Sequence, residues 1–199
     1  MKQVYVGHEN NMGITLKETY AKSNNAINEI TECLNKYIPW NKQEVYFLCI
    51  GTDRSTGDSF APLVGAYLEK LGVKNVIGTI KNPAHATNLN ERIKEIPEGS
   101  FIIALDACLG EIKNIGKIKV IKGRCEPGKS VNKNLTKVGD LTLTYVVNVA
   151  SVDSKLNFMV LQNTRLDTVI EGSEVVSNAI SKSYLSNKIM SGTLNYKYA

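Results

Sequence analysis

The sequence is poor in several residues and patterns that mark whole classes of protein. Its four cysteines are widely spaced and form no Cys-x-x-Cys pair, which is typical of reduced thiols in a cytosolic protein. No apolar run approaches the ~20 residues that a membrane-spanning helix needs. The N-terminus lacks the basic and then apolar pattern of a secretory signal. These absences predict a cytoplasmic protein without a membrane partner.

Blocks of like charge are also absent. Lys and Arg number 24 against 19 Asp and Glu, and the net charge of +5 comes from lysines scattered along the chain. No aromatic-interleaved basic patch or nucleic-acid motif accompanies this charge. We therefore expect no nucleic-acid partner, although general attraction to acidic molecules remains open.

A length of 199 residues with 43% hydrophobic content is enough to bury a substantial core. We expect a single α/β domain over 1–199, with an N-terminal helix at about 15–38, a core at about 44–181 and a frayed polar tail at 183–199. No internal repeat is present, and the composition leaves a homo-oligomer open.

The chain is organised around the stretch 44–71. An unbroken apolar run at 45–50 predicts a strand buried on both faces. A polar loop at 51–59 follows, and a helix is expected to begin near Pro62, whose missing N–H suits the first helical turn. The loop therefore lies at the carboxyl end of a parallel strand, where ligands bind in open α/β sheets.

Apolar runs and helical periods alternate along the rest of the chain. Further strands are predicted at 75–80, 101–105, 118–121 and 141–149, and further helices at about 89–96 and 166–180. The strand at 118–121 alternates as an exposed strand or an edge strand does. Asn88 and Glu91 have the spacing of a capping box, and Asn163 and Thr164 are placed to cap the last long helix. This order predicts a three-layer α/β/α sandwich with a mainly parallel sheet.

Two aspartates follow buried strands of this sheet. Asp58 stands just before a helix, where backbone N–H groups and the helix dipole favour an anion, and Asp106 follows the strand at 101–105. Two carboxylates brought close separate their proton affinities, so that one acts as acid and the other as base, or both bind a divalent cation. Each also has a structural interpretation, since Asp58 can cap its helix and aspartates are frequent at strand ends.

Other side chains at the same edge are weaker candidates. His85 can reach it as an acid, base or metal ligand, or can bond a backbone group instead. Cys108 is a candidate nucleophile or a small buried side chain. Ser55 and Ser59 lie in the loop of Asp58, but a serine nucleophile needs a positioned base, which only His85 could supply.

The segment 123–130 matches the phosphate-binding pattern Gly-x-x-x-x-Gly-Lys-Ser after a strand-like run. A P-loop leads directly into a helix, yet residues 131–139 show no sustained apolar helical face. The strand and aspartate at 101–106 also precede this loop instead of following it. A surface turn is therefore favoured over a nucleotide site.

Five short motifs, in this order, resemble the YyaC-type sporulation proteins, a family classed among candidate spore proteases. They are 51–59 (GTDRSTGDS), 82–86 (NPAHA), 104–110 (ALDACLG), 138–140 (VGD) and 161–166 (LQNTRL). The similarity covers about 45–180. The family is similar to the germination protease and, more distantly, to the hydrogenase maturation proteases, which implies a phosphorylase/hydrolase-like α/β/α fold.

The resemblance also implies roles for the two aspartates. The pair proposed to be catalytic in the germination protease falls on Asp58 and on Asp106. In the maturation proteases the matching acidic residues and a downstream histidine contact a metal of the substrate. No histidine follows Asp106 here, so a metal-dependent version would use His85 or none. Ala61 stands where these relatives tend to have glycine, a departure at the junction of loop and helix.

We therefore expect hydrolysis of a peptide bond in a small spore or forespore protein, with Asp58 and Asp106 sharing a proton and activating a water. The residues expected to bind substrate or support the pair are Asp53, Arg54, Ser55, His85 and Cys108. No cofactor is expected, although a divalent metal held by Asp58, Asp106 and His85 stays open. The alternatives are a non-catalytic peptide-binding or regulatory sporulation protein and, further off, a P-loop nucleotide binder.

Overall fold

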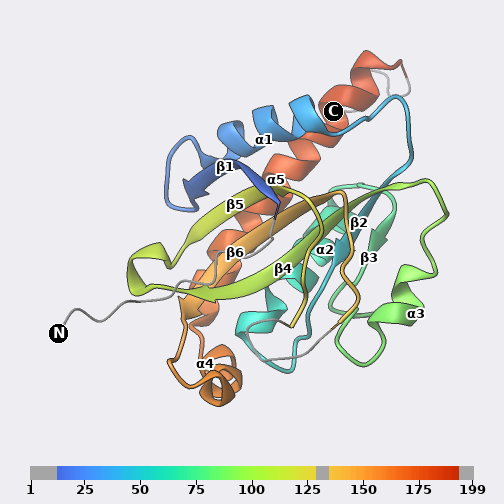
Figure 1. Ribbon diagram of the computed structural model, residues 1–199. Helices are drawn as coiled ribbons and strands as arrows, with labels where there is room; N and C mark the ends of the chain where they lie inside the picture. The colour runs from blue at the N-terminus through green and yellow to red at the C-terminus, as the bar shows by residue number, and fades with distance from the viewer. Residues whose placement is uncertain (1–12, 129–134, 193–199) are drawn as a thin grey trace.

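The computed structural model describes residues 13–128 and 135–192, which form a six-stranded sheet with helices packed on it (Figure 1). The strands are β1 (Ile14–Tyr20), β2 (Val45–Cys49), β3 (Val76–Ile77), β4 (Phe101–Gly110), β5 (Lys117–Lys122) and β6 (Leu141–Val149). Their order across the sheet is β1-β5-β6-β4-β2-β3. β4 and β6, at its centre, are the longest strands, and the first seven residues of β6 are all buried, as in a strand covered on both faces.

Parallel and antiparallel pairs share this sheet. β6, β4, β2 and β3 are parallel, whereas β5 pairs antiparallel with both β1 and β6. The predicted α/β class is confirmed, and three of the five pairings between these strands are parallel. The strand predicted at 118–121 lies within β5, but it is not an edge strand because β1 pairs along its outer side.

The N-terminal helix predicted at about 15–38 is wrong in its first part. Residues Ile14–Tyr20 form β1, and α1 (Ala26–Tyr37) begins only after a turn. Most of the apolar stripe that predicted the helix lies within α1. The preceding segment is rich in β-branched residues, which favour strands, and pairing with β5 satisfies its backbone groups.

Three helices cover one face of the sheet: α1, α2 (Phe60–Lys70) and α5 (Leu166–Met190) (Figure 1). Their apolar sides pack against inward-facing residues of the strands, among which Phe47 and Tyr145 are fully buried. Phe60 of α2 lies against Tyr145, with ring centroids 4.9 Å apart. Burial of each such side chain contributes about 1.5–3 kcal/mol. The cluster on this face has more buried side chains than the cluster on the opposite face, so it forms the larger part of the core.

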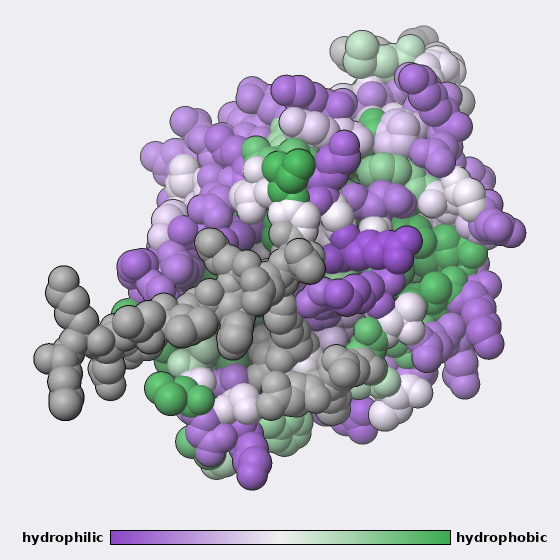
Figure 2. Space-filling model, viewed as in Figure 1, coloured by the Kyte–Doolittle hydropathy of each residue, from purple (hydrophilic) through white to green (hydrophobic). Residues whose placement is uncertain are grey.

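The opposite face carries a smaller apolar cluster around Leu48 and Ala104. One short helix, α3 (Leu89–Ile93), and irregular segments that contain Cys125 and Val138 cover it. The third layer of the predicted sandwich is therefore mostly loop. The side of the molecule seen in Figure 2 is mainly hydrophilic, and its hydrophobic side chains lie in separate patches.

The last helix is longer than predicted. The sequence predicts fraying from Ser183, but α5 continues to Met190. The buried Ser183 hydroxyl donates to Oδ1 of Asn35 at 2.6 Å, and Nδ2 of Asn187 donates to the same atom at 3.0 Å. These bonds to α1 hold the last turns, and the tail beyond 192 lies outside the described residues. Although α5 has 25 residues, no helix in the described ranges is apolar and long enough to cross a bilayer.

Neither predicted helix cap acts as one. Asn88 is the N-cap residue of α3, but its Oδ1 accepts the backbone N–H of His85 at 2.8 Å. The N-cap residue of α5 is Arg165, and the Thr164 hydroxyl donates to the Val160 carbonyl at 3.0 Å. In both places the side chain folds the preceding loop instead of capping the helix.

We expect Gly172→Ala to destabilise the protein, although alanine favours helices over glycine by ~1 kcal/mol. A Cβ at this position in α5 would lie 2.2 Å from Cε1 of Tyr145. The Tyr145 hydroxyl donates to the Thr168 carbonyl at 2.9 Å, so the ring cannot turn away without losing that bond. The free energy of unfolding in urea should fall by about 1–3 kcal/mol. Asn178→Ala, on the exposed side of the same helix, is the matched control. An equal loss in both variants would contradict this account.

Candidate functional site

Asp58 lies in a single 3₁₀ turn, Gly57–Ser59, between β2 and α2. The loop after β2 folds back on this turn, because the Thr52 N–H donates to the Asp58 carbonyl at 3.1 Å. Gly51 permits that approach: its φ is +150°, and a Cβ there would lie 2.0 Å from the same carbonyl oxygen. The side chain of Asp58 is half-buried, and Ser59 is the N-cap residue of α2.

The junction between α4 (Asn157–Gln162) and α5 supports this turn from the other side. A Cβ on Gly57 would lie 2.9 Å from Cδ2 of Leu161 and 2.9 Å from the Thr164 hydroxyl oxygen. Nδ2 of Asn148 donates to the same hydroxyl at 3.3 Å. The LQNTRL motif, which contains Leu161 and Thr164, thus packs directly against the turn and holds it in place.

Asp106 lies within β4, and the prediction that this strand ends at Leu105 is wrong. β4 continues to Gly110 because β6 runs beside it past the end of β2. Cys49, the last residue of β2, pairs with Leu105, so Asp106 is the first residue of β4 beyond that end. Its partner in β6 is Thr144. The carboxyl group therefore lies where the neighbouring parallel strand stops.

The two aspartates influence each other electrostatically. The pKa of Asp106 is raised well above its ordinary value of 3.8, chiefly by burial and next by the charge of Asp58. Hydrogen bonds from the backbone N–H of Ala107 and from the thiol of Cys125 act in the opposite direction. Two carboxyl groups that interact in this way titrate as a pair. Such a pair therefore retains a proton to higher pH than isolated aspartates do.

Sequence reasoning missed Cys125, which contacts Asp106. Its Sγ donates to Oδ2 of Asp106 at a distance of 3.9 Å. Cys125 reaches the site because it pairs antiparallel with Val138: its N–H donates to the Val138 carbonyl at 2.7 Å, and the reverse bond measures 3.2 Å. No local pattern in the sequence signals this pairing.

Cys108 lies two residues beyond Asp106 and on the same face of β4. Burial, together with the charge of Asp106, raises the pKa of its thiol to about 12. The thiol therefore stays protonated at neutral pH, whereas a nucleophilic cysteine needs a stabilised thiolate. The environment favours the structural interpretation of Cys108 over a nucleophile, although the side chain is half-buried and not fully buried.

His85 follows a segment that lies beside the start of the Asp58 loop. The Gly51 N–H donates to the Ala84 carbonyl at 2.8 Å, which places His85 near the carboxyl end of β2. Its Nδ1 lies 3.0 Å from the Thr87 hydroxyl oxygen. The ring is therefore engaged locally at one nitrogen, as the structural interpretation of His85 predicts.

The remaining loop residues differ in exposure. Asp53 and Arg54 are exposed, and Nε of Arg54 donates to the Thr52 hydroxyl at 3.4 Å. Ser55 is 4% exposed, and within the described chain its hydroxyl has no hydrogen-bond partner. The Ser59 hydroxyl donates to the Thr56 carbonyl at 2.6 Å. The Ser59 hydroxyl thus stabilises the turn. The Ser55 hydroxyl is buried without a hydrogen-bond partner among the described residues, and its burial has no structural explanation.

Metal and nucleotide sites gain no support from this geometry. Within 13–128 and 135–192 no group of three or more His, Cys, Asp and Glu side chains could hold a metal ion, so we derive no metal-dependent step. In the P-loop-like segment, β5 ends at Lys122 and Cys125 pairs back with Val138. Lys129 and Ser130, which complete that pattern, lie outside the described residues.

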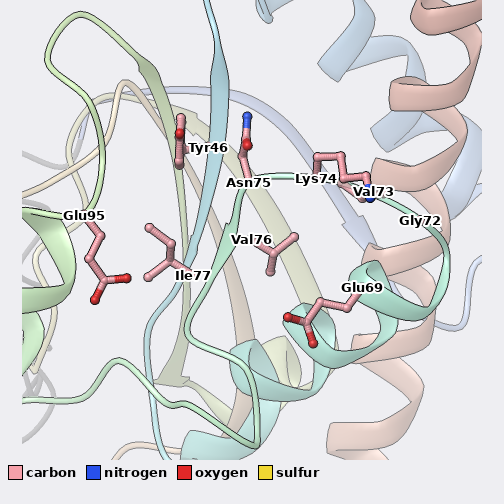
Figure 3. Close-up of a pocket in the computed structure, with 9 residues that line it drawn as sticks. All are labelled: Tyr46, Glu69, Gly72, Val73, Lys74, Asn75, Val76, Ile77 and Glu95. Atoms are coloured by element: carbon pink, nitrogen blue, oxygen red, sulfur yellow. The ribbon is translucent and has the colours of Figure 1, made fainter.

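A hollow of about 530 Å³ lies along the edge strand β3 (Figure 3). Its lining consists of Tyr46, Glu69, Gly72, Val73, Lys74, Asn75, Val76, Ile77 and Glu95. In Figure 3 the side chains of Glu69 and Glu95 lie on either side of the strand. None of the predicted site residues lines this hollow, which is therefore separate from the aspartate pair.

Comparison with known proteins agrees with the family resemblance. Residues 18–179 match the family described as "Protein of unknown function (DUF1256)". The chain belongs to the DUF1256 family. This DUF1256 chain is 41% identical over 142 residues to the "Uncharacterized protein YyaC" of Bacillus subtilis (strain 168), an alignment that covers 69% of the chain and 68% of the relative.

A solved structure shares the fold of this DUF1256 protein. It is the crystal structure of a [NiFe] hydrogenase maturation protease HycI from Thermococcus kodakarensis KOD1, with a TM-score of 0.51 and 16% sequence identity. The match covers 76% of this chain and 98% of HycI. The predicted relation to YyaC-type proteins and to the maturation-protease fold is confirmed. At this identity the likeness concerns the fold alone.

We expect Asp106→Asn to stabilise the protein increasingly as pH rises. The folded pKa of Asp106 is raised, so the stability from its neutral form is present below pH 3.8 and is lost as pH rises through the folded pKa. Asparagine keeps the shape and never ionises. Thermal melts should therefore show a gain in Tm over the wild type that begins near the ordinary pKa of 3.8 and grows until the pH exceeds the folded pKa of Asp106. Asp167→Asn, an exposed site on α5, is the control. A gain that is constant across this range would rule out a buried charge at Asp106.

Proposed function

We propose that this DUF1256 protein hydrolyses peptide bonds of a protein substrate, with Asp58 and Asp106 as its catalytic pair. The observation that carries this proposal is the place of Asp106, the first residue of β4 beyond the end of β2 and near enough to the loop of Asp58 for the charge of Asp58, together with desolvation, to raise its pKa. A carboxyl group that keeps its proton beside one that has lost it supplies an acid and a base at the same pH. That combination is what water-mediated attack on a peptide bond requires.

In the proposed mechanism Asp58 is the base and Asp106 the acid. Asp58 is half-buried and precedes α2, whose dipole favours its ionised form. The Asp58 carboxylate takes a proton from a water molecule as the water oxygen attacks the peptide carbonyl carbon. Asp106 gives its proton to the carbonyl oxygen, and a neutral tetrahedral intermediate forms.

The second half of the reaction restores both groups. Asp58 gives its proton to the leaving nitrogen as the C–N bond breaks. Asp106 takes a proton from one hydroxyl of the intermediate, which becomes the carbonyl of the new carboxylic acid. Each turnover therefore consumes one water and leaves Asp58 ionised and Asp106 protonated, as at the start.

The surrounding loop is proposed to bind the substrate. Asp53 and Arg54 are exposed beside the pair and can hold polar groups of an approaching chain. His85 retains its Nε2 for an oxyanion or a substrate carbonyl, since its contact with Thr87 uses Nδ1.

The proposed substrate class is inferred from similarity to other proteins. The resemblance to sporulation proteins supports a small protein of the developing spore as substrate, and the forespore cytoplasm as the place of action. The solved structure of HycI, titled a hydrogenase maturation protease, supports protease chemistry on this fold. Because similar folds host different functions, cleavage itself has to be measured.

The direct test is cleavage of spore-extract proteins by the purified protein, with new N-termini identified by mass spectrometry. Asp106→Asn and Asp58→Asn should each lower the cleavage rate at least about 100-fold, because general acid–base catalysis of this kind contributes that much. Asp167→Asn removes an exposed carboxylate on α5 and should cleave at the wild-type rate. If the wild type and Asp106→Asn give the same cleavage pattern, the pair is not catalytic.

A non-catalytic peptide-binding protein is the second candidate. The exposure of Asp53 and Arg54 in the loop of Asp58 favours it, because exposed charged side chains can hold a peptide without any chemistry on it. This candidate predicts peptides that are retained intact. It also predicts that Asp106→Asn binds them as tightly as the wild type, as isothermal titration with the retained peptides would show.

A further inference from the structure

We propose that Cys125 is a positioning residue for Asp106: its thiol donates a hydrogen bond to Oδ2 and thereby orients the carboxyl group. The catalytic consequence of this contact rests on the proposed function, whereas the contact itself does not. Neither the family motifs nor the spacing of the cysteines points to it. The inference comes from the place of Cys125 in the fold.

The contact joins a donor and an acceptor of matching kind. Sγ of Cys125 lies 3.9 Å from Oδ2 of Asp106, within the reach of an S–H donor. Cys125 is 3% exposed, so water does not compete freely for this bond. Burial, the charge of Asp106 and the neighbouring Cys108 all raise the pKa of the Cys125 thiol. It therefore stays protonated and acts as a donor.

Backbone bonds fix Cys125 relative to β4, the strand that carries Asp106. Cys125 and Val138 exchange two hydrogen bonds, of 2.7 Å and 3.2 Å. The residues two positions further along the same two segments are bonded as well: the Gly123 N–H donates to the Asp140 carbonyl at 3.0 Å. Asp140 in turn accepts the Ile102 N–H of β4 at its Oδ2 at 2.9 Å, and its own N–H donates to the Ile102 carbonyl at 2.8 Å. Hydrogen bonds therefore connect the segments of Cys125 and Val138 to β4 at Ile102, the strand on which Asp106 lies.

The ionisable groups that act on Asp106 and Cys125 are acidic, so the Cys125 thiol is a hydrogen-bond donor in acidic surroundings. Asp58 acts on Asp106, while Asp106, Cys108 and Glu126 act on Cys125. Glu126 forms an ion pair with Lys137. The S–H group and the Ala107 N–H are the donors that offset the burial of Asp106 and the charge of Asp58. A thiol is a weak donor, so it favours the ionised carboxylate without making its protonation impossible.

The bond also restricts where a proton of Asp106 can lie. Because the thiol hydrogen points at Oδ2, a carboxyl proton directed at Sγ would face another hydrogen. We therefore expect the proton of Asp106 to lie on the side away from Sγ, where the proposed reaction needs it for the substrate carbonyl oxygen.

Infrared spectroscopy of the S–H stretch tests the contact directly. The Cys125 band is assigned by its loss in Cys125→Ala. In Asp106→Leu, which is similar in size but offers no acceptor, this band should move to higher wavenumber. The band of Cys49, a buried thiol elsewhere in the core, is the internal control and should not move. An unchanged Cys125 band in Asp106→Leu would overturn the proposal.

Kinetics then test the consequence for catalysis. Cys125→Ala should lower kcat about tenfold with KM unchanged, because it disorders the acid and not the bound substrate. Its pH–rate profile should shift to higher pH, since the carboxylate of Asp106 loses a donor. A wild-type kcat and pH profile in Cys125→Ala would refute the positioning role. If the infrared band responds to Asp106 but the wild type cleaves nothing, the proposed function fails and the contact stands.

Discussion

Asp106 is half-buried, and both its desolvation and the negative charge of Asp58 oppose the ionisation of its carboxyl group. A buried carboxylate is costly unless hydrogen bonds compensate it, so the surrounding chain has to supply donors and hold them still. The Ala107 N–H and the Cys125 thiol are such donors. The rest of the candidate site can be understood as the structure that keeps these groups together.

Close backbone contacts provide that structure. The absence of side chains at Gly51 and Gly57 lets the turn of Asp58 press against the strand end and against the α4–α5 junction. Asp140 ties the segment of Cys125 to β4. Each contact joins parts of the chain that are far apart in sequence. The loss of one would move an aspartate or its donor without affecting the large apolar core on the other face of the sheet.

The elements that sequence patterns predicted well are those with a strong local signal. β2 follows an unbroken apolar run, α1 contains most of an apolar stripe of helical period, and α2 begins close to Pro62, as predicted. β1 was missed because its strand character depends on pairing with β5, which lies about a hundred residues away. The last turns of α5 were missed because polar residues such as Ser183 bond to α1 instead of packing as apolar side chains do.

For the candidate site, the sequence by itself determined which acidic residues follow buried strands, since strand ends and the loops after them can be recognised from composition. That made Asp58 and Asp106 candidates, and their catalytic role stays a prediction. Only the tertiary structure decided that the charge of Asp58 acts on Asp106, that β4 continues past it, and that Cys125 donates to it. The physical reason is that a pKa and a hydrogen bond depend on distance in space. The parallel pairing of β4 with its neighbours and the pairing of Cys125 with Val138 set that distance. Neither pairing can be predicted from a short stretch of sequence.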